Sequence, residues 1–84
     1  MYSVDLLEEA FDYLAALPAE ARGAFLALWD LLELHPWSGD PANRQRPEVN
    51  MRTHPFGDRR QGLATYLILE DQRKVFVLRI VWVD

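Results

Sequence analysis

The stretch MRTHPFGDRRQG, residues 51–62, places four cationic or titratable side chains around a Phe-Gly-Asp turn: Arg52, His54, Arg59 and Arg60. An imidazole gives and takes protons near neutral pH, so His54 is the candidate acid–base group. Guanidinium groups bind phosphate through paired N–H donors. Cleavage of RNA through its own 2′-hydroxyl needs a base, an acid and cations that stabilise the crowded phosphate. This segment therefore favours phosphate chemistry on a polyanionic substrate.

Roles in such a reaction can be assigned to individual residues. The candidate catalytic set is Arg52, His54 and Arg79, with both guanidinium groups on the scissile phosphate. Other side chains can clamp a flanking phosphate or stack an unpaired base. These candidate substrate-binding residues are Arg59, Arg60, Phe56 and Tyr66.

Each assignment has a structural alternative. A histidine before a proline, such as His54, can be a solvated turn residue, and Phe56 can simply cover the hairpin. Arg79 can pair across strands with Glu48 or Glu70. The two histidines, with no cysteine, do not make a metal site, so we expect no metal ion and no cofactor.

The charge of the chain is unevenly distributed. The 84 residues suffice for one domain, residues 1–84, with a formal net charge of −4. Residues 1–40 carry −7 and residues 41–84 carry +3. Such asymmetry indicates a polyanionic or acidic partner for the second half. The lack of cysteine fits a reducing cytoplasm, and no apolar run approaches the roughly 20 residues that span a bilayer, so we expect a cytoplasmic protein without a membrane partner.

Apolar periodicity predicts the order of the elements. Residues 2–6 alternate like a strand, and residues 7–17 and 18–35 follow two helical patterns that meet at Pro18. Residues 35–47 predict a loop. Residues 48–54, 62–70 and 74–83 predict three strands, the last two joined by a short hairpin. The predicted class is α+β: a short N-terminal strand, a helical hairpin, then a three-stranded antiparallel meander with the helices on one sheet face.

Strand alternation predicts which side chains share a face. In the last strand Phe76, Leu78, Ile80 and Trp82 fall on one side, which we expect to pack on the helices. Arg79 then lies on the open face, where its charge stays in water. The same alternation puts Arg52 and His54 on the open side, opposite Val49 and Met51. The three candidate catalytic groups are thus expected to converge on one sheet face.

Three segments of the chain carry a resemblance: YSVDLLEEAFDYLAALP as the opening strand and helix, HPWSGDP after the second helix, and the closing meander from MRTHPFG onward. Through them the chain resembles the RelE/ParE superfamily of small bacterial toxins from type II toxin–antitoxin pairs. The family pattern Gly-x-x-x-Tyr followed by V-x-V-L-x-V is matched loosely by Gly62, Tyr66, Val75, Val77, Leu78 and Val81. The basic residue that ribonuclease members carry shortly before the tyrosine falls on Leu63.

This resemblance implies a toxin that a cognate antitoxin neutralises. The leading mechanism is endoribonuclease action on mRNA at the ribosome, which the concave sheet face would contact. The alternatives are a ParE-like, non-enzymatic inhibitor of DNA gyrase and a non-toxic interaction module of the same fold. The antitoxin is expected to add a strand or lay a helix over the open side of the sheet.

Overall fold

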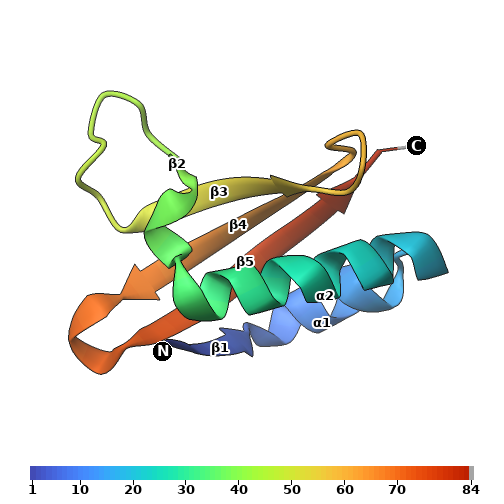
Figure 1. The fold of residues 1–84 in the computed structure, drawn as a ribbon, viewed down its shortest axis with the longest axis horizontal. Helices are drawn as coiled ribbons and strands as arrows, with labels where there is room; N and C mark the ends of the chain where they lie inside the picture. The colour runs from blue at the N-terminus through green and yellow to red at the C-terminus, as the bar shows by residue number, and fades with distance from the viewer. Residues whose placement is uncertain (84) are drawn as a thin grey trace.

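The computed structural model describes residues 1–83, which form a five-stranded sheet with the second helix across one face and the first helix beside the last strand (Figure 1). Helix α1 (Glu8–Ala15) and helix α2 (Ala19–Leu34) follow the first strand, and two short 3-10 turns, η1 (Pro36–Ser38) and η2 (Glu70–Gln72), lie in the connections. The strands are β1 (Ser3–Leu6), β2 (Asp40–Pro41), β3 (Met51–Phe56), β4 (Gly62–Leu69) and β5 (Lys74–Trp82). Their order across the sheet is β1-β5-β4-β3-β2, with β1 parallel to β5 and the other neighbours antiparallel.

The helical hairpin forms where the apolar periodicity predicts it. Glu8 and Glu9 occupy the first turn of α1, where they favour the positive end of the helix dipole. Pro18 is extended and immediately precedes α2, so one helix stops and the next starts within a few residues. Helix α2 then buries Ala21, Phe25, Leu28 and Leu32, which recur at helical spacing along one side.

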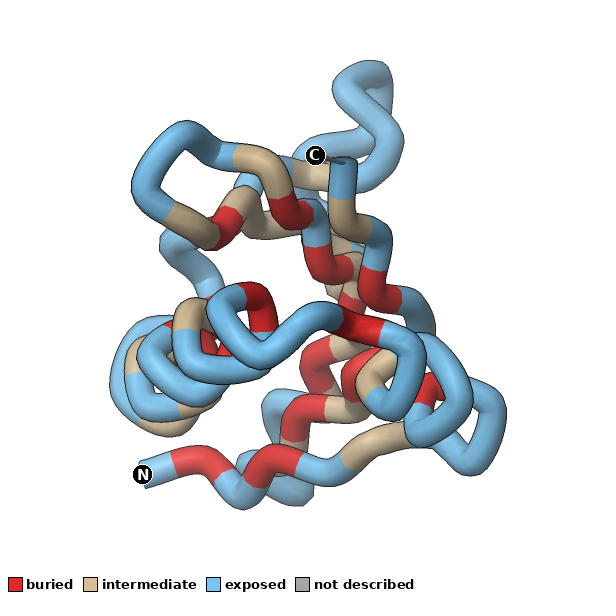
Figure 2. Tube along the Cα trace, turned by 90° about the vertical axis from the view of Figure 1, so that its right-hand side faces the viewer, coloured by how far each residue is buried: buried red, intermediate tan, exposed pale blue. Residues whose placement is uncertain are grey.

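The core lies between the helices and one sheet face. In Figure 2 the buried segments of the helices and of the strands lie where the two layers face each other. From the sheet the core takes Ala64, Tyr66 and Ile68 of β4, each at most 1% exposed. None of the helices in residues 1–83 is both long enough and apolar enough to cross a membrane.

The α+β class and the closing meander are confirmed, and the sheet has one strand more than predicted. Strand β2 has only two residues, within the segment predicted as a loop. Two residues are too few to show any alternation, and they pair with Thr53 and Arg52 only because the chain folds back there.

Strand β5 contains an irregularity that changes which side chains face the helices. The ladder pairs Thr65 with Arg79 but Tyr66 with Val77, so Leu78 is an extra residue, a β-bulge. Val75 and Val77 are therefore buried before the bulge, and Ile80 is buried after it.

Because of the bulge, half of the predicted side-chain orientations in β5 are wrong. Phe76 and Leu78 were expected under the helices, but both are half-buried and lie outside the core cluster. Ile80 and Trp82 do pack on the core as predicted. Arg79 lies on the open face as expected, because the extra residue turns it away from the side of Val77.

Candidate functional site

The predicted convergence of Arg52, His54 and Arg79 is wrong. Residues paired in register project from the same face of a sheet. Arg52 pairs with Tyr66 and His54 with Ala64, and both of these partners are fully buried beneath the helices. Arg79 pairs with Thr65, on the opposite face.

The reason lies at the end of β3. The strand continues two residues beyond its predicted end, to Phe56, which is 6% exposed. The Phe56 ring meets the ring of Phe25 on α2, with 5.6 Å between centroids. Because side chains alternate, burying Phe56 also turns His54 and Arg52 toward the helical side, and it puts Met51 on the open face.

Arg52 holds the loop that leads into β3. Its NH1 donates to the Gly39 carbonyl at 3.1 Å, and its NH2 donates to the Pro47 carbonyl at 2.6 Å. Its guanidinium carbon lies 4.9 Å from the ring centroid of Trp37. The third guanidinium nitrogen, Nε, is buried and has no hydrogen-bond partner within residues 1–83. Both terminal nitrogens of Arg52 therefore donate to backbone carbonyls, and a phosphate would have to compete with those oxygens.

His54 faces α2. Its Nδ1 lies 2.7 Å from the Pro55 carbonyl, a distance at which a protonated Nδ1 donates to that oxygen. The histidine lines a hollow of about 210 Å³ between β3 and α2. The other lining residues are Ala24, Ala27, Leu28, Leu31, Pro55, Phe56 and Gly57, none of which is ionisable.

The two aromatic residues predicted to stack bases lie in the core. Phe56 contacts Phe25 and also Trp82, whose ring centroid is 5.7 Å away. Tyr66 is fully buried and donates its hydroxyl to the Pro36 carbonyl at 2.6 Å. Burial raises the pKa of Tyr66 to about 12. Neither ring presents a face to a ligand.

Arg59 and Arg60 lie in the exposed turn between β3 and β4. Gly57 and Arg60 both take positive φ there, 96° and 58°. Arg59 lines an open hollow of about 560 Å³ that also contains the acidic residues Glu20 and Asp58. The turn is thus mixed in charge, and it stands apart from both Arg52 and Arg79 in the ladder.

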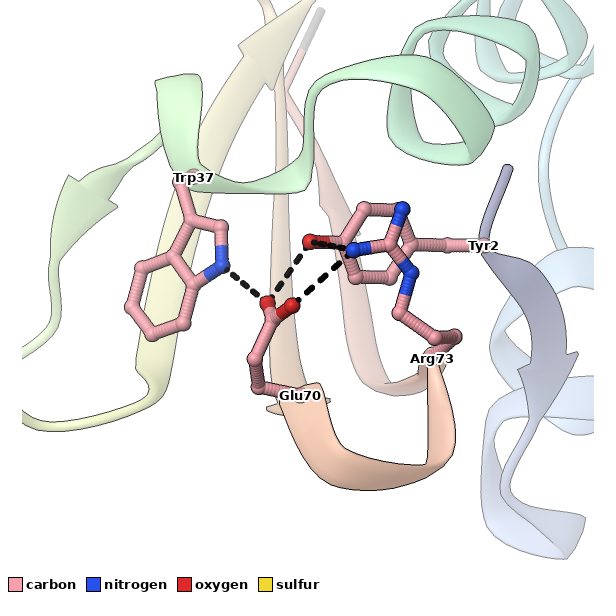
Figure 3. Close-up of polar contacts among 4 residues, drawn as sticks. All are labelled: Tyr2, Trp37, Glu70 and Arg73. Atoms are coloured by element: carbon pink, nitrogen blue, oxygen red, sulfur yellow. Dashed lines mark hydrogen bonds and ion pairs between the residues drawn. The ribbon is translucent and has the colours of Figure 1, made fainter.

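A polar cluster that sequence reasoning missed joins three parts of the chain (Figure 3). Glu70 Oε1 accepts from the Tyr2 hydroxyl at 2.6 Å and from Trp37 Nε1 at 2.7 Å, and Oε2 pairs with Arg73 at 3.1 Å. Hydrogen bonds from Tyr2 and Trp37 lower the pKa of Glu70, and the bond to Glu70 raises the pKa of Tyr2. The cluster ties the N-terminus and the loop before β2 to the β4–β5 hairpin.

Among residues 1–83, neither ion pair involves Arg79. Glu70 pairs with Arg73 three residues on, and Glu48 pairs with Arg46 at 3.4 Å, so the predicted cross-strand alternatives for Arg79 are wrong. The only signal for the Glu70 cluster was the short spacing of Glu70 and Arg73. The partners Tyr2 and Trp37 are distant in sequence and could not be identified from it.

The open sheet face, defined by the register, is mainly apolar. Its polar row runs from Asp40 through Thr53 and Thr65 to Arg79. Two apolar rows flank it, one of Met51, Leu67 and Phe76 and one of Pro55, Leu63 and Val81. Leu63, Val81 and Met51 are 43%, 38% and 37% exposed. The face that was expected to be basic therefore has one guanidinium in its polar row, between two apolar rows. Lys74, which pairs with Leu69, projects from the same face, and its ammonium lies 6.0 Å from the centroid of the Phe76 ring.

Solved structures of RelE toxins have the same fold. A chain of the RelBE2 toxin–antitoxin complex from Mycobacterium tuberculosis matches with a TM-score of 0.82 and 21% identity, over 98% of this chain and 98% of that one. The isolated E. coli RelE toxin matches with a TM-score of 0.80 and 13% identity, over 100% of this chain and 86% of that one. For the intact E. coli RelBE complex the TM-score is 0.77, at 17% identity, over 100% and 99% of the two chains. Neither a protein-family model nor a curated protein sequence matches the chain.

The chain therefore has the RelE toxin fold, as its resemblance to that superfamily implied. At identities of 13% to 21% the likeness is one of fold. The activity has to be argued from the side chains that this chain places on it.

Proposed function

We propose that this chain is the toxin of a type II toxin–antitoxin pair, which arrests growth until a cognate antitoxin binds it. One observation carries the proposal: the fold match runs from end to end of the chain, both to a free RelE toxin and to RelBE complexes. A match of this extent leaves no additional domain within residues 1–83 to suggest another role.

The first candidate mechanism is endonucleolytic cleavage of mRNA at the ribosome. It was predicted from Arg52, His54 and Arg79. A single phosphate cannot contact His54 and Arg79 together, since they project from opposite faces of the sheet. Cleavage would therefore have to use Arg79 with groups other than His54.

The second candidate is inhibition by contact, as in the proposed gyrase inhibitor, and the composition of the open face favours it. Leu63 stands where ribonuclease members have a basic residue, and it is 43% exposed between Pro55 and Val81. Apolar side chains of this kind bind protein surfaces, whereas transition-state charge on a phosphate needs cations.

Controlled expression in a bacterial host tests both levels of the proposal. The proposed function predicts growth arrest that is relieved by co-expression of the product of the neighbouring gene. If growth continues unchanged while folded protein accumulates, the toxin assignment is wrong.

The mechanism is read in the same cells. Inhibition by contact predicts that His54→Ala still arrests growth and that cellular mRNA stays intact at the onset of arrest. A supercoiling assay with purified protein then tests gyrase as the target. Loss of arrest in a folded His54→Ala variant, together with mRNA cleavage by the wild type, would establish the ribonuclease mechanism instead.

A further inference from the structure

The open sheet face has the composition of a protein-binding surface. Helix α2 covers the opposite face of the sheet and α1 runs beside β5, so the two apolar rows are partly solvent-exposed in the isolated chain. Contiguous exposed apolar groups in a small protein commonly mark an interaction surface. Helix α1 borders this face at β5, where Asp12 and Tyr13 line a hollow of about 540 Å³ together with Arg79 and Val81.

Arg79 is the distinctive polar group of this face. It is exposed, and its guanidinium carbon lies 5.9 Å from the centroid of the Tyr13 ring on α1. Asp12 lines the same hollow but forms no ion pair with Arg79. No carboxylate of residues 1–83 pairs with it. Asp40, at the other end of the polar row, is three strand spacings away, about 14 Å, which is too far for an ion pair.

The bulge in β5 specifies the direction of Arg79. Strict alternation from the buried Val77 would bring Arg79 to the helical side, and the extra residue Leu78 returns it to the open face. Bulges commonly re-aim a side chain near functional sites. An unpaired guanidinium is thereby held among exposed apolar groups.

The edge of the sheet formed by β2 and β3 is less suited to binding a partner segment than the open face is. The Ala42 N–H donates to the Met51 carbonyl at 3.0 Å, so the backbone groups of Met51 point toward β2. By alternation the nitrogen of Pro55 points outward along the same edge, where it has no hydrogen to donate. A proline in this position blocks the addition of a further strand.

We propose that the open face binds a segment of a partner protein that presents apolar side chains around one carboxylate, and that this carboxylate pairs with Arg79. The naming of that partner as the antitoxin rests on the proposed toxin function, but the chemistry of the surface does not. The apolar rows supply contact area and the desolvated ion pair fixes the register of the segment. RNA fits this face less well, because its two cations, Arg79 and Lys74, lie in different rows with the apolar row of Phe76 between them, so they do not line up on successive phosphates.

Selection from a displayed library of random peptides tests the proposal without any use of toxicity. We expect the wild-type chain to select peptides with apolar residues around an Asp or Glu. The charge-reversed variant Arg79→Glu should bind those peptides about tenfold more weakly and select Lys or Arg in place of the acid. Because Arg79 is exposed, this variant should fold normally.

Matched controls locate the binding on the molecule. Leu63→Asp, on the open face, should abolish binding, whereas Leu26→Asp, on the exposed side of α2, should leave it unchanged. Peptides that bind Leu63→Asp as well as the wild type, selected sequences without an acid, or no binders at all would overturn the proposal. So would displacement of the peptides by a single-stranded RNA oligonucleotide. A chain that selects acidic peptides but does not arrest growth would refute the toxin function and leave this inference intact.

Discussion

At the scale of single residues, the path of the chain before β3 depends most on the hydroxyl of Tyr66. It donates to the Pro36 carbonyl from a fully buried position. Gly39 lies directly over it: a Cβ at that position would overlap the Tyr66 hydroxyl and come within 2.7 Å of the Thr53 carbonyl. Any residue with a Cβ would therefore clash at position 39. Tyr66 acts as a structural anchor rather than as a base-stacking group.

The raised pKa of Tyr66 predicts a specific loss of stability in alkali. The unfolded value is 10.0 and the folded value is about 12, so the folded chain holds this proton more tightly. The stabilisation is complete below pH 10 and is lost as the pH rises through the folded pKa. A shift of this size corresponds to about 3 kcal/mol.

Chemical denaturation at pH 10 and pH 12 of the wild type and of Tyr66→Phe measures this effect. Tyr66→Phe should be less stable at neutral pH, because the Pro36 carbonyl loses its donor. Its free energy of unfolding should fall less between the two pH values, since the titrating group is gone. Parallel losses in the two proteins would show that Tyr66 does not titrate as described.

At the scale of the elements, β5 is the strand that determines both faces of the sheet. Every residue of β5 from Lys74 to Trp82 other than Leu78 has a partner in β4. Deleting Leu78 should therefore straighten the strand without changing the direction of any other side chain. We expect a cost of about 1 kcal/mol in the free energy of unfolding, as for other moderate changes outside a core.

Deleting Val81 is the matched control, because Val81 is also outside the core but has a partner in the ladder. Its loss would turn Trp82 from Phe56 toward solvent, at a cost of about 3 kcal/mol. Thermal unfolding of both deletion variants measures the difference. If deletion of Leu78 were as damaging as deletion of Val81, the extra residue would not be where the register puts it.

The same strand explains what the sequence could and could not predict. Helical periodicity and long β-rich runs predicted both helices and the closing meander, because each pattern repeats several times. The sides of Phe76 and Leu78 could not be predicted, since a bulge leaves no trace in the pattern of apolar residues and reverses the parity at a single point. The sides of Arg52 and His54 depended on the burial of Phe56, which is a contact with a distant helix.

The candidate site was predictable in part for the same reason. Arg79 was placed correctly because the cost of burying an unpaired guanidinium does not depend on register. The polar contacts of Arg52 and the Glu70 cluster involve Trp37 and Tyr2, which only tertiary structure brings into reach. The distribution of charge along the chain indicated a basic second half. Several of those cations lie in turns and loops, and Arg52 donates to backbone carbonyls.

At the scale of the whole molecule, the two faces of the sheet have different roles. The helical layer carries much of the acidic first half and buries the core, and the far side of the sheet is left open with its apolar rows and Arg79. A toxin that acts by contact needs such a surface to be exposed in the free chain and covered when its antitoxin is bound. This division accounts for a RelE fold in which the predicted acid–base group faces a helix.

The most direct test of this account is the growth rate after induction of Leu63→Asp beside that of the wild type. The open face is predicted to be the working surface, so the wild type should arrest growth and folded Leu63→Asp should not, because a carboxylate there disrupts the apolar row between Pro55 and Val81. Arrest by Leu63→Asp equal to that by the wild type would contradict the account.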